Sequence, residues 1–445
     1  MKKASLIGAC LCALIAALPA TAAAESGTPI PGQYIVVLED GADGRGVASE
    51  HARSAGAKVA HTYDAAVHGY AAQLDAAGLA KVKADRRVAA VVQDREGDPL
   101  GADMLPTGIN RVDAELGQSV ALATMAEDGT TTTPDPGTVA VMDTGIDTSH
   151  PDLTVAGGVN CLGAKNSYND GTINDKQGHG THIAGIIGAK ENGFGIEGVA
   201  PGVNLQSVRT NDSLGVSSTS RQLCGINWVT ENAAALGIKV VNSSQTLIGA
   251  TGQGTCTSDV LHQAICNSTA AGVTWVFSAM NSTRDFKDVS GASWDEVLTV
   301  TAMADSNGQP NVGSTAKFSC KAVMSGASGT SGVDDTTATF SNWAVTTADQ
   351  VHTVAAPGVC IYSTWKGSAY GYLSGTSMAA PHVAATVHRC IRSGQCVGTP
   401  AEIIQKVRGD AAAYNQANPK YGFKGDPLRP TTGRYMGYLV NAAAY

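Results

Sequence analysis

Three residues in the chain have the types required for nucleophilic catalysis. Ser377 stands in a run of small residues, Ser374–Pro381, which lets a substrate backbone come close to it. A serine hydroxyl is a weak nucleophile, so it needs a base to take its proton and a third group to orient that base. His179 and Asp143, both upstream, have the types for these two roles. The chain order Asp, His, Ser therefore predicts a serine activated by a carboxylate-oriented histidine.

The residues around this set predict how each side chain is positioned. Asp143 closes the apolar run Thr138–Met142, which predicts a buried strand. The residues after Ser377 predict a buried helix that begins at the serine and leaves its backbone N–H free to bind a developing anion. We expect Pro381 in the first helical turn, where a missing N–H is tolerated.

Three segments carry a resemblance to a known family. Val139–Leu153, Gly178–Gly185 and Ser374–Ala384 resemble, in order, the three catalytic blocks of the subtilisin-like serine proteases, and the resemblance runs from about Tyr34 to the end. It implies an endopeptidase that cleaves protein or peptide substrates through an acyl-enzyme. Two alternatives stay open, namely a processing protease of narrow specificity and a binding protein on an inactive protease fold.

Length and composition limit the other possibilities. The 445 residues predict two or three folding units, and 43% hydrophobic with 15% charged residues favours a globular protein. The formal net charge of −8, without a basic block, argues against nucleic-acid binding. We expect a monomer without a membrane span.

The N-terminus predicts export. Met1–Lys3 and the short apolar run Ala4–Leu18 are typical of a secretory signal peptide, which we place at residues 1–24, so we expect a secreted, extracellular protein. A lipoprotein signal ending at Cys10 is the alternative, but only nine residues precede that cysteine.

The cysteines indicate disulfide bonds. Ten are present, and Cys10 and Cys12 leave with the signal. An even number in an exported protein favours disulfides, and the absence of a CxxC pair makes a zinc site the weaker alternative. Short spacing favours the local pairs Cys256–Cys266 and Cys390–Cys396, and the other connectivity stays open. The eight that remain are Cys161, Cys224, Cys256, Cys266, Cys320, Cys360, Cys390 and Cys396.

Residues 25–100 predict a small α+β domain, ferredoxin-like in type, that resembles the family's propeptide. Such a domain assists folding and inhibits the mature enzyme; the alternative is a domain that stays attached. Alignment places its end near Leu100, so the first substrate would be the Leu100–Gly101 bond and the primary pocket would accept leucine. The expected strands are Tyr34–Leu38, His68–Leu74 and Val88–Val92, and the expected helices are Gly46–Ser54 and Ala76–Ala84.

Residues 101–445 predict the catalytic domain, an α/β fold with a parallel sheet and helices on both faces. Catalytic residues are expected at the carboxyl ends of the strands. Asp305–Thr337 is Gly/Ser-rich and predicts a surface insertion containing Cys320. The expected strands are Thr138–Met142, Leu205–Val208, Lys239–Asn242, Thr274–Ser278 and Val297–Ala302, and the expected helices include Gly180–Ala189 and Thr219–Leu236.

The resemblance also implies further site residues. Asn281 matches the family's oxyanion asparagine, beside the N–H of Ser377. Thr246 and Met280 stand where the family usually has glycines that line the primary specificity pocket, so a narrower pocket is possible. By resemblance, the substrate-binding residues are Leu214, Gly215, Val216, Ser243, Ser244, Gln245, Thr246 and Met280.

A structural calcium site is implied in the same way. Asp152 matches a carboxylate ligand of the family, and oxygen ligands of this kind suit a hard cation. A plain glycine-rich turn is the alternative. The loop residues that match the family's calcium ligands are Lys190, Asn192, Phe194 and Ile196. His182, three residues after His179, is expected to be a packed structural histidine.

Overall fold

The structure is a computed structural model that describes residues 28–39, 41–64, 68–96, 103–116, 137–164, 166, 170–257, 259–324 and 330–445. The chain divides into two compact units, Met1–Gly101 and Ala102–Tyr445. The predicted signal peptide and the Leu100–Gly101 bond lie outside the described residues.

The first unit is an antiparallel four-stranded sheet in the order β2-β3-β1-β4 with two helices, which confirms the predicted small α+β fold. Asp43 and Asp75 cap the helices by accepting hydrogen bonds from Gly46 N (3.1 Å) and Gly78 N (2.7 Å). The elements are β1 (Thr28–Leu38), α1 (Gly44–Ser54), β2 (Lys58–Tyr63), β3 (Gly69–Gln73), α2 (Ala76–Lys83) and β4 (Val88–Glu96).

Strand β2 is the element of this unit that the sequence did not reveal. It pairs at the sheet edge with β3 alone, and most of its side chains are exposed or half-buried. An edge strand of this kind has no apolar face to mark it in the sequence. The buried residues of the unit come instead from the inner strands and the helices, among them Val36, Tyr70 and Val82.

The second unit is built on an eight-stranded sheet in the order β13-β10-β9-β8-β5-β7-β6, with β14 paired to β10. Its strand pairs are parallel except for that between β10 and the short β13. The strands are β5 (Thr138–Asp143), β6 (Val155–Asn160), β7 (Asn204–Arg209), β8 (Ile238–Ser243), β9 (Thr274–Ser278), β10 (Leu298–Ala304), β13 (Thr336–Thr337) and β14 (Thr353–Pro357).

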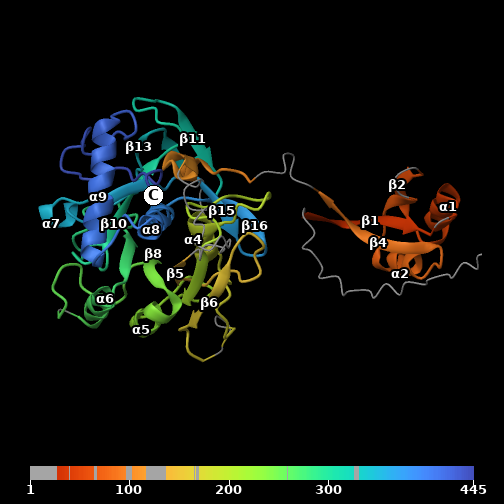
Figure 1. Cartoon of the computed structure of the whole chain (residues 1–445), viewed down its shortest axis with the longest axis horizontal. Coiled ribbons are helices and arrows are strands. Elements are labelled where there is room, and N and C mark those ends of the chain that lie inside the picture. The colour runs from red at the N-terminus through yellow and green to blue at the C-terminus, as the bar shows by residue number, and fades with distance from the viewer. Residues whose placement is uncertain are drawn as a thin grey trace, which may run out of the picture. The chain divides into compact units, whose positions relative to one another are not determined.

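Helices cover both faces of this sheet, as predicted (Figure 1). Side chains alternate along β5: Val139 and Val141 pack with α4 and α8, whereas Ala140 and Met142 pack with α5 and α6. The helices are α3 (Thr107–Arg111), α4 (His179–Gly188), α5 (Thr219–Leu236), α6 (Val260–Ala270), α7 (Thr347–Gln350), α8 (Thr376–Arg392) and α9 (Pro400–Ala417), with a 3-10 turn at Ala114–Leu116.

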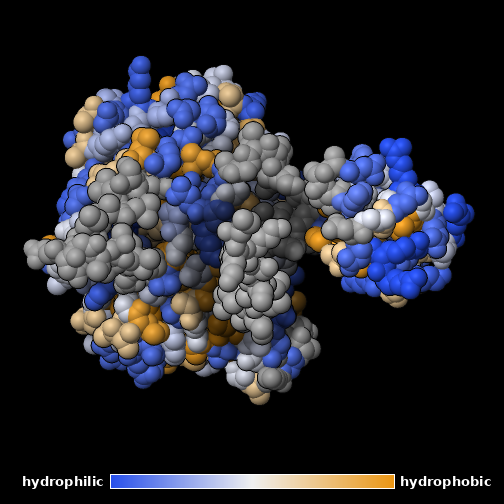
Figure 2. All heavy atoms as spheres, turned by 45° about the vertical axis from the view of Figure 1, so that its right-hand side comes forward, coloured by the Kyte–Doolittle hydropathy of each residue, from blue (hydrophilic) through white to orange (hydrophobic). Residues whose placement is uncertain are grey.

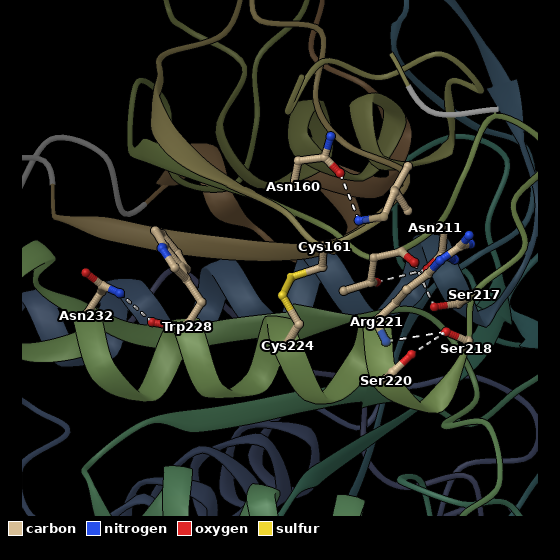
Figure 3. The surroundings of a disulfide bond; sticks show 12 residues. Asn160, Cys161, Asn211, Ser217, Ser218, Ser220, Arg221, Cys224, Trp228 and Asn232 are labelled. Carbon is tan, nitrogen blue, oxygen red and sulfur yellow. Dashed lines mark hydrogen bonds between the residues drawn. A yellow bond between two sulfur atoms is a disulfide. The ribbon is translucent and has the colours of Figure 1, made fainter. Parts of the chain in front are cut away.

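Disulfides join surface segments to this framework. The predicted local pairs Cys256–Cys266 and Cys390–Cys396 are confirmed. Cys161–Cys224 joins the residue after β6 to α5, as Figure 3 shows. Cys320–Cys360 ties the insertion to the chain between β14 and β15. Two antiparallel hairpins complete the unit, β11 (Lys317–Cys320) with β12 (Thr330–Val333) and β15 (Ile361–Trp365) with β16 (Ala369–Leu373).

The insertion is anchored by a buried charge cluster that the sequence did not reveal. Nε and Nη2 of Arg111 donate to Asp335 Oδ1 at 3.0 and 2.8 Å, and Arg111 Nε lies 3.5 Å from Asp305 Oδ1. All three side chains are at most 1% exposed. Burial raises the pKa of Asp305 to about 7, although Arg111 opposes the rise. A single guanidinium therefore stabilises two buried carboxyl groups of the inserted segment.

The visible surface mixes hydrophilic and hydrophobic residues without one dominant apolar area (Figure 2). Within the described ranges, no helix has the length and apolar character needed to cross a membrane.

We predict that Arg111→Met lowers the free energy of unfolding by about 3–5 kcal/mol at pH 8, because it leaves buried carboxylates without their cation. The loss should be smaller at pH 5. The folded-state pKa of Asp305 is raised, so its protonated form is favoured in the folded protein and stability falls as the pH rises through about 7. Guanidinium unfolding of the inhibited enzyme at both pH values measures this.

Arg284→Met is the matched control, because Arg284 is exposed and should cost within about 0.5 kcal/mol. Equal losses at pH 5 and pH 8 would show that the charge of the cluster is not what stabilises the insertion.

Candidate active site

Asp143 and His179 meet at the carboxyl end of β5. Asp143 is 1% exposed, and its Oδ1 accepts hydrogen bonds from His179 Nδ1 and from its neighbour Thr144 N, both at 2.8 Å. The imidazole of His179 is 22% exposed, so the part of the ring that does not contact Asp143 is accessible to solvent. A buried carboxylate thus fixes which ring nitrogen of His179 faces outward.

The start of α4 has to lie very close to the end of β5. A Cβ on Gly180 would stand 2.1 Å from the carbonyl oxygen of Gly145, so only glycine fits there. Gly180 N donates to Thr144 Oγ1 at 2.9 Å. Asp175 fixes the preceding turn, because its carboxylate accepts from Gly178 N (2.8 Å) and Thr181 N (3.0 Å). These contacts hold the backbone of His179 against the strand.

The pKa of His179 lies above its ordinary value. Burial alone would lower this pKa, but the charge of Asp143 and its hydrogen bond favour the imidazolium more strongly. The pair is therefore suited to accept a proton at the outward-facing nitrogen Nε2.

Ser377 is the second residue of α8 and is 9% exposed. Its hydroxyl donates to the carbonyl oxygen of Ser244 at 3.4 Å. Both Ser377 and His179 are described, and no hydrogen bond joins them in this structure. Catalytic hydrogen bonds are often long or poorly aligned without substrate, and they tighten only in the substrate complex.

The expected position of Pro381 in the first turn of the helix is wrong. Pro381 is the sixth residue of α8, where an ordinary residue would donate its N–H to the carbonyl of Ser377. Proline lacks that N–H, and Ser244 Oγ donates to the Ser377 carbonyl instead, at 3.0 Å. Proline is thus tolerated because a side chain on a neighbouring segment replaces the missing donor.

Asn281 follows β9 and faces the start of α8. Its Oδ1 accepts from Thr376 N (2.9 Å) and Thr376 Oγ1 (3.0 Å). This anchoring fixes the orientation of the amide, and within the described part of the chain Nδ2 makes no hydrogen bond. The exposed Nδ2 is therefore free to donate to an oxyanion beside Ser377.

The predicted substrate-binding segments differ in how accessible they are. Leu214 and Val216 are 64% and 55% exposed. Their N–H groups donate to Asp212 Oδ1 (3.0 and 3.1 Å), and the N–H of Gly215 donates to the Asp212 carbonyl (2.9 Å). Because these three N–H groups already donate to Asp212, a substrate strand that pairs with residues 214–216 would have to use other backbone groups.

Ser243, Ser244 and Gln245 are buried, whereas Thr246 is exposed. Gln245 turns inward, and its Nε2 donates to the Met142 carbonyl at 3.1 Å. The side chains of this segment thus serve the fold, and its backbone is what a substrate would meet.

Met280 adopts a backbone conformation that favours glycine, with φ of +71°. This agrees with the glycine that the family usually has here. Its side chain is partly buried against the cluster that contains Ala279, Phe286 and Val289.

Three of the residues predicted to hold calcium, Asp152, Asn192 and Ile196, contact one another. The buried carboxylate of Asp152 accepts from Asn192 Nδ2, Ile196 N and Tyr370 Oη, each at 3.1 Å. Burial raises the pKa of Asp152 to about 6. Among the described residues, nothing donates to the carbonyl oxygens of three loop residues, which are Lys190, Phe194 and Ile196.

Asp103 is a site residue that the sequence did not reveal. Its Oδ2 accepts from the N–H groups of Asn192 and Gly193 at 2.9 and 3.2 Å. Its Oδ1 is buried without a partner in the described chain. An unpaired buried carboxylate oxygen fits a hard cation, provided that the Asn192 amide turns to present Oδ1, which here accepts from Phe194 N at 3.2 Å.

His182 is structural, as expected. Its Nε2 lies 3.1 and 3.0 Å from the carbonyls of Ile361 and Gly371, and burial lowers its pKa to about 3. The neutral ring donates to both carbonyls and ties α4 to the β15–β16 hairpin.

The sheet is covered on both faces, the buried Asp143 orients His179, and Ser377 lies near the N-terminus of α8, a helix that shares one core cluster with α4. Together these features define the class, an α/β protein with the side chains of a serine hydrolase. Comparison with known families makes this specific: the Subtilase family matches residues 137–423, and the Peptidase inhibitor I9 family matches residues 33–97. The chain belongs to the subtilase family and is a serine endopeptidase with an I9 propeptide domain. The predicted family, fold and activity are confirmed.

Relatives agree with this assignment. Subtilisin E of Bacillus subtilis (strain 168) is 33% identical over 319 residues, which are 72% of this chain and 69% of that protein. Subtilisin DY of Bacillus licheniformis is 35% identical over 246 residues, 55% of this chain and 73% of that protein. Minor extracellular protease Epr of Bacillus subtilis (strain 168) is 34% identical over 247 residues, which are 56% of this chain and 30% of that protein.

A solved structure shows the same fold. A cold adapted subtilisin-like serine proteinase aligns with a TM-score of 0.51 and 23% identity, and the alignment covers 76% of this chain and 97% of that one.

We predict that Asn281→Ala lowers kcat by about 10²–10³-fold with little change in KM, because the donor Nδ2 acts only when negative charge develops. Thr376→Val is the matched control. It removes one of the two hydrogen bonds that orient the amide, and it should cost less than about tenfold. Steady-state kinetics on a peptide substrate measures both, and equal losses would mean that Asn281 acts only by holding the start of α8.

Proposed function

We propose that the chain is a secreted endopeptidase whose triad is Asp143, His179 and Ser377. The Ser377 hydroxyl turns from Ser244 toward His179 Nε2 when substrate binds, and it attacks the peptide carbonyl as His179 takes its proton. His179 then gives the proton to the leaving amine, and water releases the acyl group by the reverse route. The observation that carries the proposal is the 2.8 Å hydrogen bond from His179 to the buried Asp143.

Asp143 stays ionised and stabilises the imidazolium, while the oxyanion receives two donors. These are the N–H of Ser377, near the start of α8, and Nδ2 of Asn281. The substrate backbone would lie between the segments 214–216 and 243–246.

The maturation scheme rests on the I9 domain. We propose a signal peptide at 1–24, a propeptide at 25–100 that inhibits the enzyme, and a mature enzyme at 101–445 released by its own cleavage of Leu100–Gly101. The division of the chain into compact units after Gly101 supports this boundary. Export is supported by the apolar N-terminal run and by the extracellular relative.

We predict that Ser377→Ala lowers kcat by about 10⁶-fold, the loss found when a subtilisin nucleophile is removed. The variant should accumulate with residues 25–100 attached, whereas the active enzyme should begin at or near Gly101. N-terminal sequencing shows at which residue each chain begins. Labelling with an organophosphonate shows whether the serine of the wild-type enzyme is reactive. A processed Ser377→Ala chain, or an unlabelled wild-type serine, would contradict the triad.

A calcium ion is proposed to stabilise the loop 190–196. Asp103, Asp152 and Asn192 would supply side-chain oxygens, and backbone carbonyls would come from Lys190, Phe194 and Ile196. A bound ion would screen the repulsion between the two carboxylates and fix the loop.

We predict that chelation lowers the melting temperature and that added Ca²⁺ restores it. Asp152→Asn should remove most of this dependence, because it deletes the buried ligand charge. Asp170→Asn is the control for general destabilisation, since Asp170 pairs with the buried guanidinium of Arg209 and is not a ligand of the proposed site; it should lower the melting temperature and leave the Ca²⁺ dependence intact. Calorimetric scans of the inhibited enzyme with and without Ca²⁺ measure the effect, and equal melting temperatures would exclude the site.

A narrower processing specificity is the second candidate, favoured by the side chain of Met280 at a position with left-handed backbone. Cleavage profiles on a peptide library separate it from broad degradation.

A further inference from the structure

Four metal-binding side chains meet on the opposite side of the sheet from α4 and α8. They are Cys256, His262, Cys266 and Glu296, and one ligand atom from each lies within 4.8 Å of all the others. In the described parts of the chain no other His, Cys, Asp or Glu side chains form such a group. Cys256 and Cys266 are joined as a disulfide here, so their sulfurs do not bind metal in this state.

We propose that reduction of the Cys256–Cys266 disulfide creates a Zn²⁺ site in which these two thiolates, His262 and Glu296 are the ligands. Disulfide and metal would be mutually exclusive occupants of one cluster.

The spacing within α6 suits a metal. His262 and Cys266 are four residues apart, so their side chains lie on the same face of the helix. His262 Nε2 and Glu296 Oε2 are 2.9 Å apart and need to separate only to roughly 3.3 Å, the spacing set by tetrahedral Zn–N and Zn–O bonds of about 2.1 Å. Cys256 Sγ lies 3.4 Å from Glu296 Oε1. Two thiolates with an imidazole and a carboxylate are a donor set that zinc accepts in tetrahedral geometry.

The histidine is held in place independently of the disulfide. Its side chain is fully buried and stacks on Trp294, with ring centroids 4.1 Å apart and planes at 2°. Glu296 is 29% exposed, which leaves a path for an ion to enter.

The loop that carries Cys256 is also fixed without the disulfide. Asp259 Oδ2 accepts from Thr251 N and Oγ1 at 3.1 and 3.0 Å, and Trp294 Nε1 donates to the Thr251 carbonyl at 3.1 Å. Asp259 Oδ1 accepts from His262 N at 2.9 Å and so caps α6. Reduction therefore leaves the start of the loop and the helix in register. The two sulfurs need to separate only to roughly 3.8 Å, the spacing set by Zn–S bonds of about 2.3 Å.

This disulfide should be open to selective reduction. Both of its cysteines are partly exposed, whereas Cys360 and the Cys390–Cys396 pair are buried. The Cys161–Cys224 bridge joins a buried cysteine to an exposed one, so it is the competing disulfide whose integrity has to be verified. A phosphine supplies two electrons, breaks the S–S bond and becomes a phosphine oxide with oxygen from water, leaving two thiols. When Zn²⁺ binds, the thiols release two protons to solvent and two Zn–S bonds form.

The test uses the full chain with Ser377→Ala to prevent autolysis. A limiting amount of phosphine is added, and peptide mapping after alkylation verifies that Cys256 and Cys266 are thiols and the other disulfides are intact. Co²⁺ is then titrated as a spectroscopic probe and displaced with Zn²⁺. We expect one Co²⁺ per chain with intense tetrahedral and thiolate-to-metal bands, which the all-oxygen site at Asp152 cannot produce. Zn²⁺ should slow alkylation of both cysteines at least tenfold.

Variants identify the ligands. Glu296→Gln is conservative and partly exposed, and it should weaken Zn²⁺ binding by at least about tenfold. Glu231→Gln, on the exposed side of α5, is the matched control and should change nothing. His262→Gln should also weaken binding, but it removes a buried stacked ring, so Glu296→Gln decides if that variant does not fold. The proposal is overturned if the verified dithiol gives no thiolate band, if Glu296→Gln binds as tightly as the control, or if the oxidised protein binds equally well.

Discussion

The hydrogen bond between His179 and Asp143 depends on two segments of chain being held almost in contact. The bond is 2.8 Å long, and it exists because Gly180 lies where any Cβ would collide with the Gly145 carbonyl. Asp143 ends a central strand and is buried, so it cannot move to follow the histidine. The start of α4 must instead be brought to the strand, and the carboxylate of Asp175 holds the turn that does this. The hydrogen bond between the two side chains thus depends on close packing of the backbone at Gly145 and Gly180.

The serine is positioned by a hydrogen bond that replaces one missing from its helix. Pro381 removes one donor from α8, and Ser244 supplies it from the segment after β8. The same Ser244 accepts the Ser377 hydroxyl through its backbone carbonyl. Ser244 therefore contacts Ser377 at both its backbone and its side chain.

The sequence predicted the elements whose side chains are apolar at a clear period, and it failed where a residue's role depends on a distant partner. Strands β5, β7, β8, β9 and β10 and the helices α4, α5 and α8 were found from their buried faces, whereas β14 and α9 also have buried residues and were missed. The edge strand β2 has no such face and was missed. Asp103 and Arg111 were missed because their partners lie about 90 and more than 200 residues away, at Asn192 and Asp335. Pro381 was misplaced because its compensation comes from another segment.

Carboxylates are buried at three places in this fold, and each place stabilises them in a different way. At Asp143 the partner is a titratable imidazole, and the arrangement leaves a proton acceptor facing solvent. At Asp305 and Asp335 the partner is a permanent guanidinium, which fixes the insertion but offers no chemistry. At Asp103 and Asp152 the chain supplies only neutral donors, burial raises the pKa of Asp152 to about 6, and one oxygen of Asp103 has no partner among the described residues. Because an unpaired buried carboxylate is costly, that third group requires either a proton or a cation from solution. The carbonyl oxygens of Lys190, Phe194 and Ile196, to which no described residue donates, are the ligands that such a cation would use if it is bound.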